Sequence, residues 1–545
     1  MRLRVFLLAF VAFGALGITW AFASPPLSNP DEPAHSVKAA ATVRGQFVPP
    51  KEQQPDEGKG SLLRGGFTTR VNVPYSYTWQ TSKLPLCYIY DADATAGCAP
   101  HFDGDATVIC KRFDPRPPES CPPKFDDDRE LTRWVTLIGR YPPPYYLAIG
   151  WPTRFDTGEI SFYAMRVLSA LLNAALLGLA VACAAAATRL RFMVVGVLVA
   201  TTPEALVLAG AINPNSIEIS AAICTWVAAT VAVLGEGERR CQRQVLAALT
   251  VGAVALAWSR ALGTLWLLVI AIVVLLAFGN RARLATRLHG RGERVALGVI
   301  ALASVGAVAW TFGADVLGNQ SGYEPRGLGL VDATTHSLGL TVSYLRQMVA
   351  VFGWQREPSP VWLSMLWGLA ALALVAVAVW PDRWARRRAA PRDGAAPGPA
   401  TGVRARWTIL GLTVLVVLLP TIMQAPTAPD FGFVWSGRYG IAIAAGVPIL
   451  AAAVISARGV SPNAMKALAG SVVAAVGLGQ VVAHWENMRR YVVGLNGPVF
   501  YLGHDGWTPP LGAPLLLAVV VAASTGLAWL GYRLAVGTPA AVADR

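Results

Sequence analysis

The chain has 545 residues, of which 54% are hydrophobic and only 14% are charged. Its mean hydropathy is +0.47. A soluble domain normally carries a larger share of charge, so the composition excludes an ordinary soluble enzyme and indicates an all-α polytopic membrane protein. The net charge of +14 does not indicate a nucleic-acid partner, because arginines beside membrane spans mainly set the orientation of the chain in the lipid bilayer.

Apolar stretches of about 17 to 25 residues, the length that crosses a bilayer, recur along the sequence. We expect about 12 transmembrane helices, at 4–23, 160–186, 192–211, 214–235, 245–261, 263–279, 295–317, 360–380, 407–424, 438–457, 467–485 and 512–532. The pair within 245–279 is predicted as two helices and not one, because Arg260 stands in the middle with Gly263 close behind.

Arginine is concentrated before the first expected span and after the fourth, sixth and eighth. With twelve spans these segments share one side of the membrane, which is therefore predicted to be cytoplasmic. We expect a multi-pass protein of the plasma (inner) membrane with both termini inside. The predicted parts are a first transmembrane helix at 1–23, an extracytoplasmic loop at 24–159, transmembrane helices 2–8 at 160–380 with an outer segment at 318–359, a basic cytoplasmic linker at 381–406, helices 9–12 at 407–532 and a cytoplasmic tail at 533–545.

The first span has two interpretations. Ala21-Phe22-Ala23 before Ser24 fits the small-residue pattern of a signal-peptidase site, and cleavage there would leave eleven spans. We favour a retained anchor, because the apolar run from Val5 to Ala23 is longer than a usual signal core.

The large outer loop is expected to hold two short helices, at 33–45 and at 127–139, with an irregular lobe at 48–125 between them. Four cysteines lie in this loop: Cys87, Cys98, Cys110 and Cys121. We expect them to form two disulfides that hold the lobe, and all three pairings remain open. The spacing contains no Cys-x-x-Cys pair, so a zinc site is not expected.

The second outer segment, 318–359, is apolar in its 337–352 part. We expect a membrane-surface or re-entrant helix there, because Arg346 and Gln347 make a lipid-exposed span costly. A span at this place would also invert every later loop. The linker 381–406 is rich in arginine, alanine, proline and glycine, and no fixed structure is expected for it.

The stretch SNPDEPAH, at 28–35, follows the first span and opens the first loop helix. Its proline suits the first helical position, so Asp31 and Glu32 would lie at the positive end of the helix dipole. In the plainest interpretation they are capping acids at the membrane surface. In the functional interpretation, His35 and Lys38 lie near one face and bring an imidazole and an ammonium within about one turn of the acids.

Further ionisable residues gather at the predicted outer ends of other spans: Glu204, Glu218, Arg260, Arg346, Arg438 and His484. Ionisable groups at membrane depth are costly unless they line a cavity, so this grouping predicts a polar pocket that faces outward. The three arginines suit phosphate oxygens, because a guanidinium donates hydrogen bonds in a rigid fork. Each arginine also has an ordinary alternative, in which it reaches lipid headgroups.

An acidic pair just after the first span, NPDEPAH, and a YPPPYY element at 141–146 that closes the outer loop are together typical of one superfamily. The chain resembles the GT-C superfamily of polytopic glycosyltransferases. More narrowly, NPDEPAH, INPNSIE, FGW, SGRY and RYVVGLNGP resemble a poorly characterised family of actinobacterial membrane proteins placed in that superfamily.

The resemblance implies an inverting transferase that moves a sugar from a polyprenyl-phosphate donor to an extracytoplasmic cell-envelope acceptor, a glycan, lipid or protein. It implies that Asp31 is the catalytic base and Glu32 a second acid or ligand. Tyr145 and Tyr146 would lie near the sugar. Arg260 or Arg438 would lie near the donor phosphate. Some relatives use a divalent metal, Mg or Mn, which Asp31 and Glu32 would hold, and others do not; the sequence leaves this open.

Two other classes of function remain open. A transporter or flippase of envelope precursors shares the layout of twelve spans with both ends inside, but carriers usually show two matching halves, which this sequence lacks. A non-catalytic envelope-assembly protein would use the acids only to cap a helix. Such a protein would tolerate Asp31→Asn, whereas a transferase would lose its activity.

Overall fold

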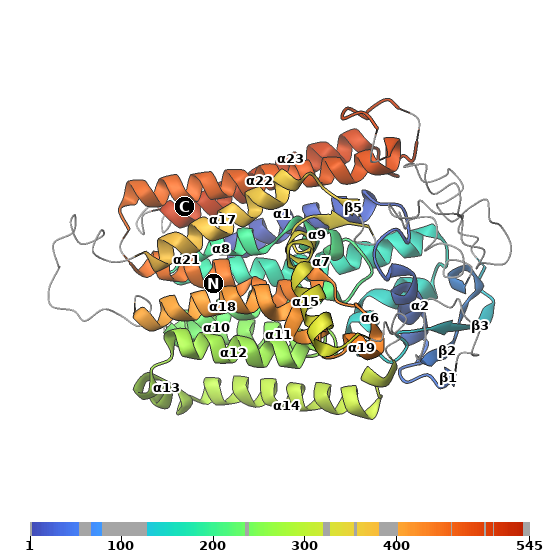
Figure 1. The fold of residues 1–545 in the computed structure, drawn as a ribbon, viewed down its shortest axis with the longest axis horizontal. Helices are drawn as coiled ribbons and strands as arrows, with labels where there is room; N and C mark the ends of the chain where they lie inside the picture. Colours follow the sequence, from blue (N-terminus) through green and yellow to red (C-terminus); the bar gives the residue numbers. More distant parts are fainter. Residues whose placement is uncertain are drawn as a thin grey trace.

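The structure is a computed structural model, and it describes residues 3–53, 67–78, 128–234, 239–319, 328–353, 357–380, 402–458, 460–494, 497–504 and 506–537. Long helices run side by side, with α2, α6 and a small sheet at one end of the molecule and α13 at the other (Figure 1). We call these the sheet end and the α13 end.

Nine helices in the described part of the chain are long and apolar enough to cross a membrane, which agrees with a polytopic helical fold. They are α1 (Leu3–Phe22), α7 (Glu159–Ala186), α10 (Asn215–Leu234), α14 (Arg291–Gly313), α17 (Val361–Val379), α18 (Val403–Gln424), the run Gly437–Ala457, α22 (Pro462–Val493) and α23 (Ala513–Val536). The run Gly437–Ala457 is built from the 3-10 helix η5 (Gly437–Gly440), α20 (Ile441–Ala444) and α21 (Gly446–Ala457).

Two shorter apolar helices, α11 (Arg239–Ala257) and α12 (Gly263–Phe278), lie where two adjacent spans were predicted. The chain turns between them, and the N–H of Gly263 donates to the carbonyl oxygen of Arg260 at 3.0 Å. The prediction of two helices around Arg260 is confirmed.

The predicted span at 192–211 is not one continuous helix. It is divided into α8 (Met193–Ala200) and α9 (Pro203–Ala209), because Pro203 supplies no N–H to continue the helical ladder. The carbonyl oxygens left open at the break accept hydrogen bonds from neighbouring helices: Val199 from the Trp367 indole at 2.8 Å and Thr201 from the Gln480 amide at 3.0 Å. The count of twelve spans stays a prediction.

The second helix predicted for the outer loop, at 127–139, is wrong. Residues Leu131–Thr136 form strand β3, which pairs antiparallel with β2 (Phe67–Pro74), and β2 pairs with β1 (Lys51–Gln53). The segment LTRWVT is rich in β-branched and aromatic residues, and its burial alternates along the strand. The described part of the loop is therefore not purely α-helical or irregular.

Short elements complete the sheet end: α6 (Pro143–Gly150), η2 (Trp151–Arg154), α15 (Leu330–Gly339), α16 (Thr341–Gln347) and α19 (Ala428–Phe431). The expected helix at 337–352 is replaced by the end of α15, by α16 and by strand β4 (Val351–Phe352), which pairs with β5 (Glu357–Pro358). At the other end lies α13 (Arg281–Leu288), and η3 (Leu317–Asn319) follows α14. The four loop cysteines with their predicted disulfides, and most of the linker 381–406, lie outside the described residues.

Candidate active site

Asp31 lies in the turn that joins α1 to α2 (Glu32–Thr42). Its backbone adopts φ 60° and ψ 1°, a left-handed conformation that aspartate tolerates better than most residues. The helix begins at Glu32 and not at 33, so Asp31 takes the N-cap position, yet its side chain makes no capping hydrogen bond. Instead, its Oδ2 accepts a hydrogen bond from Nη2 of Arg438. The carboxylate is thus bound to a cation from a distant part of the chain.

Glu32 has a different environment from its neighbour. Its carboxylate is fully buried and paired with Arg166 of α7, at 2.8 Å from Nε to Oε1 and 2.6 Å from Nη2 to Oε2. The N–H of Ile212 also donates to it, at 3.0 Å. Arg166 uses its remaining N–H groups on three carbonyl oxygens of the α1–α2 connection, those of Ala21, Ser24 and Pro25. Glu32 therefore ties the turn that holds Asp31 to α7.

Arg438, the partner of Asp31, belongs to a cluster of two arginines and two tyrosines. The guanidinium groups of Arg260 and Arg438 lie over the same ring, that of Tyr439, at 4.7 Å and 5.2 Å from its centroid. Arg260 also lies 5.9 Å from the ring centroid of Tyr141. Two cations this close repel each other unless anions compensate them. Each has a carboxylate beside it: Asp31 pairs with Arg438, and Glu218 Oε2 lies 3.7 Å from Nη1 of Arg260.

The Asp31 side chain is 42% exposed, whereas that of its partner Arg438 is 6% exposed. Partial burial acts to raise the pKa of Asp31, but the positive charges of Arg438 and Arg260 outweigh it and hold the pKa below its usual range. Asp31 is thus ionised at neutral pH and open to a second molecule.

His35 stands one turn along α2, and its Nδ1 lies 2.8 Å from the hydroxyl of Tyr146 on α6. Burial lowers the pKa of His35 to about 3, so the imidazole is neutral at pH 7. Burial likewise raises the pKa of Tyr146 well above its ordinary value. Both groups are neutral, so either one can donate the hydrogen bond between them, and neither adds charge beside Asp31.

Three residues predicted for the site make their contacts elsewhere. Lys38 is buried and donates to the carbonyl oxygens of Phe47, at 3.1 Å, and Gly139. Tyr145 shares a hydrogen bond with Ser169 at 3.0 Å and supports the loop after α9. Arg346 donates to the carbonyl oxygen of Ser359 at 3.5 Å. The structure brings together Asp31, His35, Tyr146, Arg260 and Arg438.

The second outer segment holds the short helix that carries Arg438. The side-chain oxygen of Gln347, at the end of α16, accepts from the N–H of Gly437 at 2.7 Å. A Cβ on Gly437 would lie 2.3 Å from the carbonyl oxygen of Tyr344, so only glycine fits against α16 here. Gln424 of α18 completes the support, because it donates to the Tyr344 hydroxyl at 2.8 Å and accepts from the N–H of Trp435 at 2.6 Å.

Comparison with protein families matches residues 14–447 to the family described as "Predicted membrane protein (DUF2142)". The chain belongs to the DUF2142 family. No curated protein matches it. Among solved structures, this DUF2142 protein is similar to the crystal structure of ArnT from Cupriavidus metallidurans in the apo state, with 16% sequence identity and a TM-score of 0.37. That match covers 72% of this chain and 66% of ArnT, slightly less than two thirds of the ArnT chain.

In this DUF2142 protein the two acids expected as possible metal ligands both bind arginines. A magnesium or manganese site needs several oxygen ligands around one point. Glu32 is already bound by Arg166 and a backbone N–H, and Asp31 is bound by Arg438. Among the described residues, no group of three or more histidine, cysteine, aspartate or glutamate side chains is placed to hold a metal ion.

Three residues of the site were not predicted as members of it: Tyr141, Arg166 and Tyr439. Glu218 was grouped with the ionisable residues of the expected pocket, and its Oε2 lies 3.7 Å from Nη1 of Arg260. Arg166 carried a usable signal, because a charge inside an apolar span needs a partner. Tyr439 adjoins Arg438 in SGRY, but nothing in the sequence indicates that its ring lies under both arginines.

Proposed function

We propose that this protein is an inverting glycosyltransferase of the GT-C type, which moves a sugar from a polyprenyl-phosphate donor to a hydroxyl group of a cell-envelope acceptor. The observation that carries the proposal is the ionised, partly exposed Asp31 carboxylate beside the paired guanidinium groups of Arg438 and Arg260. A base and an anion site side by side are what the transfer of a phosphate-linked sugar requires.

On the donor side, Arg260 and Arg438 bind the phosphate, because their guanidinium groups donate hydrogen bonds in a fixed fork. Without donor the cluster is close to neutral, since Glu218 compensates Arg260 and Asp31 compensates Arg438. The Tyr439 ring beneath both arginines keeps their planes in place.

On the acceptor side, Asp31 takes the proton of the attacking hydroxyl group. The acceptor oxygen forms a bond to the anomeric carbon from the face opposite the phosphate. The bond from that carbon to the phosphate oxygen breaks, and its electron pair stays on the departing phosphate. Because its pKa is lowered, Asp31 is a modest base, and we expect the proton to move late in the reaction.

The proton transfer also changes the partner of Arg438. Once Asp31 is protonated, its attraction for the guanidinium falls, and Arg438 becomes available to the phosphate as negative charge builds there. Arg438 thus pairs first with the Asp31 carboxylate and then with the departing phosphate. We place the donor at the sheet end, which is the predicted extracytoplasmic side, with its lipid chain in the bilayer.

The test is Asp31→Asn in the cell, with the envelope glycans compared between wild type, the variant and a deletion strain. We expect the variant to match the deletion strain while its amount and membrane insertion match wild type. Asp315→Asn is a suitable control, because Asp315 is also left-handed, at φ 51°, and also paired with a cation, Lys51. The control should match wild type.

Other outcomes contradict the proposal and indicate a different class. If Asp31→Asn keeps wild-type glycans while deletion alters them, the protein acts without this base, as an assembly protein would. If deletion or the variant makes a complete lipid-linked precursor accumulate on the cytoplasmic side, the protein is a transporter.

A further inference from the structure

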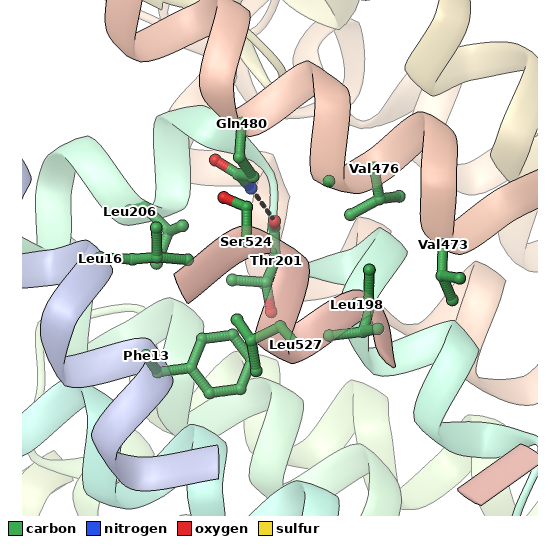
Figure 2. A pocket seen from close by; sticks show the side chains of 12 residues that line it. Phe13, Leu16, Leu198, Thr201, Leu206, Val473, Val476, Gln480, Ser524 and Leu527 are labelled. Carbon is green, nitrogen blue, oxygen red and sulfur yellow. Dashed lines mark hydrogen bonds between the residues drawn. The ribbon is translucent and has the colours of Figure 1, made fainter. Parts of the chain in front are cut away.

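A small cavity of about 20 Å³ lies next to the break between α8 and α9, away from the Asp31 cluster. Figure 2 shows it between side chains of α1, α8, α22 and α23. Its wall is mostly apolar, with Phe13, Leu198 and Leu527 among the lining residues. The polar exceptions are Thr201, Gln480 and Ser524.

Two oxygen atoms in this wall are buried and have no hydrogen-bond partner: Oε1 of Gln480 and Oγ of Ser524. These residues are 5% and 3% exposed. Gln480 donates from Nε2 to the Thr201 carbonyl oxygen at 3.0 Å, which fixes its amide and leaves Oε1 directed elsewhere. In Figure 2 the Ser524 hydroxyl lies beside that amide. A buried polar atom without a partner is costly, so Gln480 Oε1 requires a donor and the Ser524 hydroxyl requires a donor or an acceptor.

We infer that this cavity holds one ordered water molecule. The water donates a hydrogen bond to Gln480 Oε1 and either donates to or accepts from the Ser524 hydroxyl. The volume is adequate, because roughly 10–15 Å³ is enough to hold a water. Two polar partners are the minimum that retains a water in such a place, whereas a bare metal cation would need more oxygen ligands. The ligand is therefore water.

The water, Gln480, Ser524 and the Thr201 carbonyl oxygen form a polar contact that we call the joint. It lies at the only place in the described part of α8 and α9 where the series of helical hydrogen bonds is interrupted. Proteins tolerate such a break inside a bilayer when side chains and waters satisfy the freed backbone groups. Here Gln480 satisfies the Thr201 carbonyl oxygen, and the water satisfies Gln480. The joint links α8 and α9 to the α22–α23 hairpin.

The joint is linked to the turn that carries Asp31 through α9. From it α9 runs toward a loop in which the N–H of Ile212 donates to Glu32 at 3.0 Å, and the Asn213 amide donates to the Pro30 carbonyl oxygen at 2.9 Å. The direction in which α9 leaves the break therefore sets the position of that loop. This inference does not depend on the proposed transferase activity.

The direct test is an experimental structure of the full-length wild-type protein, at a resolution that shows ordered waters. We expect one density peak within hydrogen-bond distance of both Gln480 Oε1 and Ser524 Oγ. An empty cavity, with the Ser524 hydroxyl turned to a backbone carbonyl of α23, would overturn the inference.

A second test compares Ser524→Ala with Thr525→Ala by thermal unfolding in detergent. Each variant loses one hydroxyl group from adjacent positions of α23, but Ser524 is buried and Thr525 is exposed. We expect Ser524→Ala to lower the Tm and Thr525→Ala to leave it unchanged, because only the former removes a partner of the buried water. Equal Tm values for the two variants would contradict the inference.

Discussion

The buried ion pair between Glu32 and Arg166 gives the sharpest stability prediction. Both side chains are 0% exposed, and all five N–H groups of the guanidinium donate to oxygen atoms, two to the carboxylate and three to carbonyls. Arg166→Met removes every one of these donors at once and leaves a buried carboxylate without its cation. Breaking a buried pair in this way costs about 3–5 kcal/mol.

The matched control is Arg133→Met. Arg133 pairs with Glu52 at the same 2.6 Å separation, but the two side chains are 57% and 32% exposed. An exposed pair contributes about 0–1 kcal/mol, because water screens it and both side chains lose entropy. The two pairs share the same separation but differ in burial and in the number of hydrogen bonds lost, so distance does not account for the difference between the variants.

The measurement is the free energy of unfolding in mixed micelles of a mild detergent and dodecyl sulfate, followed by circular dichroism. We expect Arg166→Met to be less stable than Arg133→Met by several kcal/mol, about 3 or more. Replacing Glu32 with leucine in the Arg166→Met background should restore part of the loss, since it removes the unpaired charge. If the two single variants differ by less than about 1 kcal/mol, the pair is not an anchor of the turn.

Three more predictions concern the same end of the molecule. Arg438→Gln removes a charge that lowers the pKa of Asp31, so the acid limb of the activity profile should move to higher pH in a pH–rate series. Gly437→Ala should lower the amount of transferred sugar more than Gly411→Ala, because its Cβ meets a carbonyl oxygen of α16 at 2.3 Å while that of Gly411 meets open space. Burial lowers the pKa of Lys38 from 10.5 to about 7, so between these pH values the unfolded chain binds one proton more than the folded chain. The free energy of unfolding of wild type should therefore rise with pH over this range, and that of Lys38→Met should not. Unfolding measured at several pH values checks this.

The membrane-spanning part of the fold was largely predictable, because a bilayer demands long apolar helices and hydropathy reports them directly. The exception at 192–211 had a local signal, since Pro203 follows two threonines, but its effect depends on which neighbours satisfy the open carbonyls. Trp367 and Gln480, which supply those bonds, are far away in sequence. The strand at Leu131–Thr136 was missed because six residues are too few for a decisive hydrophobic period, and pairing with β2 decides its structure.

The candidate site was predictable in its position but not in its partners. SNPDEPAH placed Asp31 correctly at the end of a span, whereas its cation, Arg438, lies 407 residues later. Lys38 shows that helical spacing alone does not predict which side chains reach the site. It stands near Asp31 on α2, yet the packing of the strands and α6 buries it on carbonyl oxygens. Helical spacing shows which residues lie near each other on α2, but the tertiary fold decides which of them contact the Asp31 site.

The close contact between α2 and α6 has a consequence for how this chain can diversify. A Cβ on Gly150 would lie 2.6 Å from the Ala39 carbonyl oxygen, and Arg44 donates to the Thr153 hydroxyl at 2.9 Å, so the two ends of the outer loop are fastened to each other. Strands β2 and β3, which pair from Thr69 with Thr136 to Pro74 with Leu131, hold the two ends of the segment that joins them. Insertions, deletions or exchanged modules in that segment can therefore be accommodated while α2, α6 and the turn that carries Asp31 keep their places.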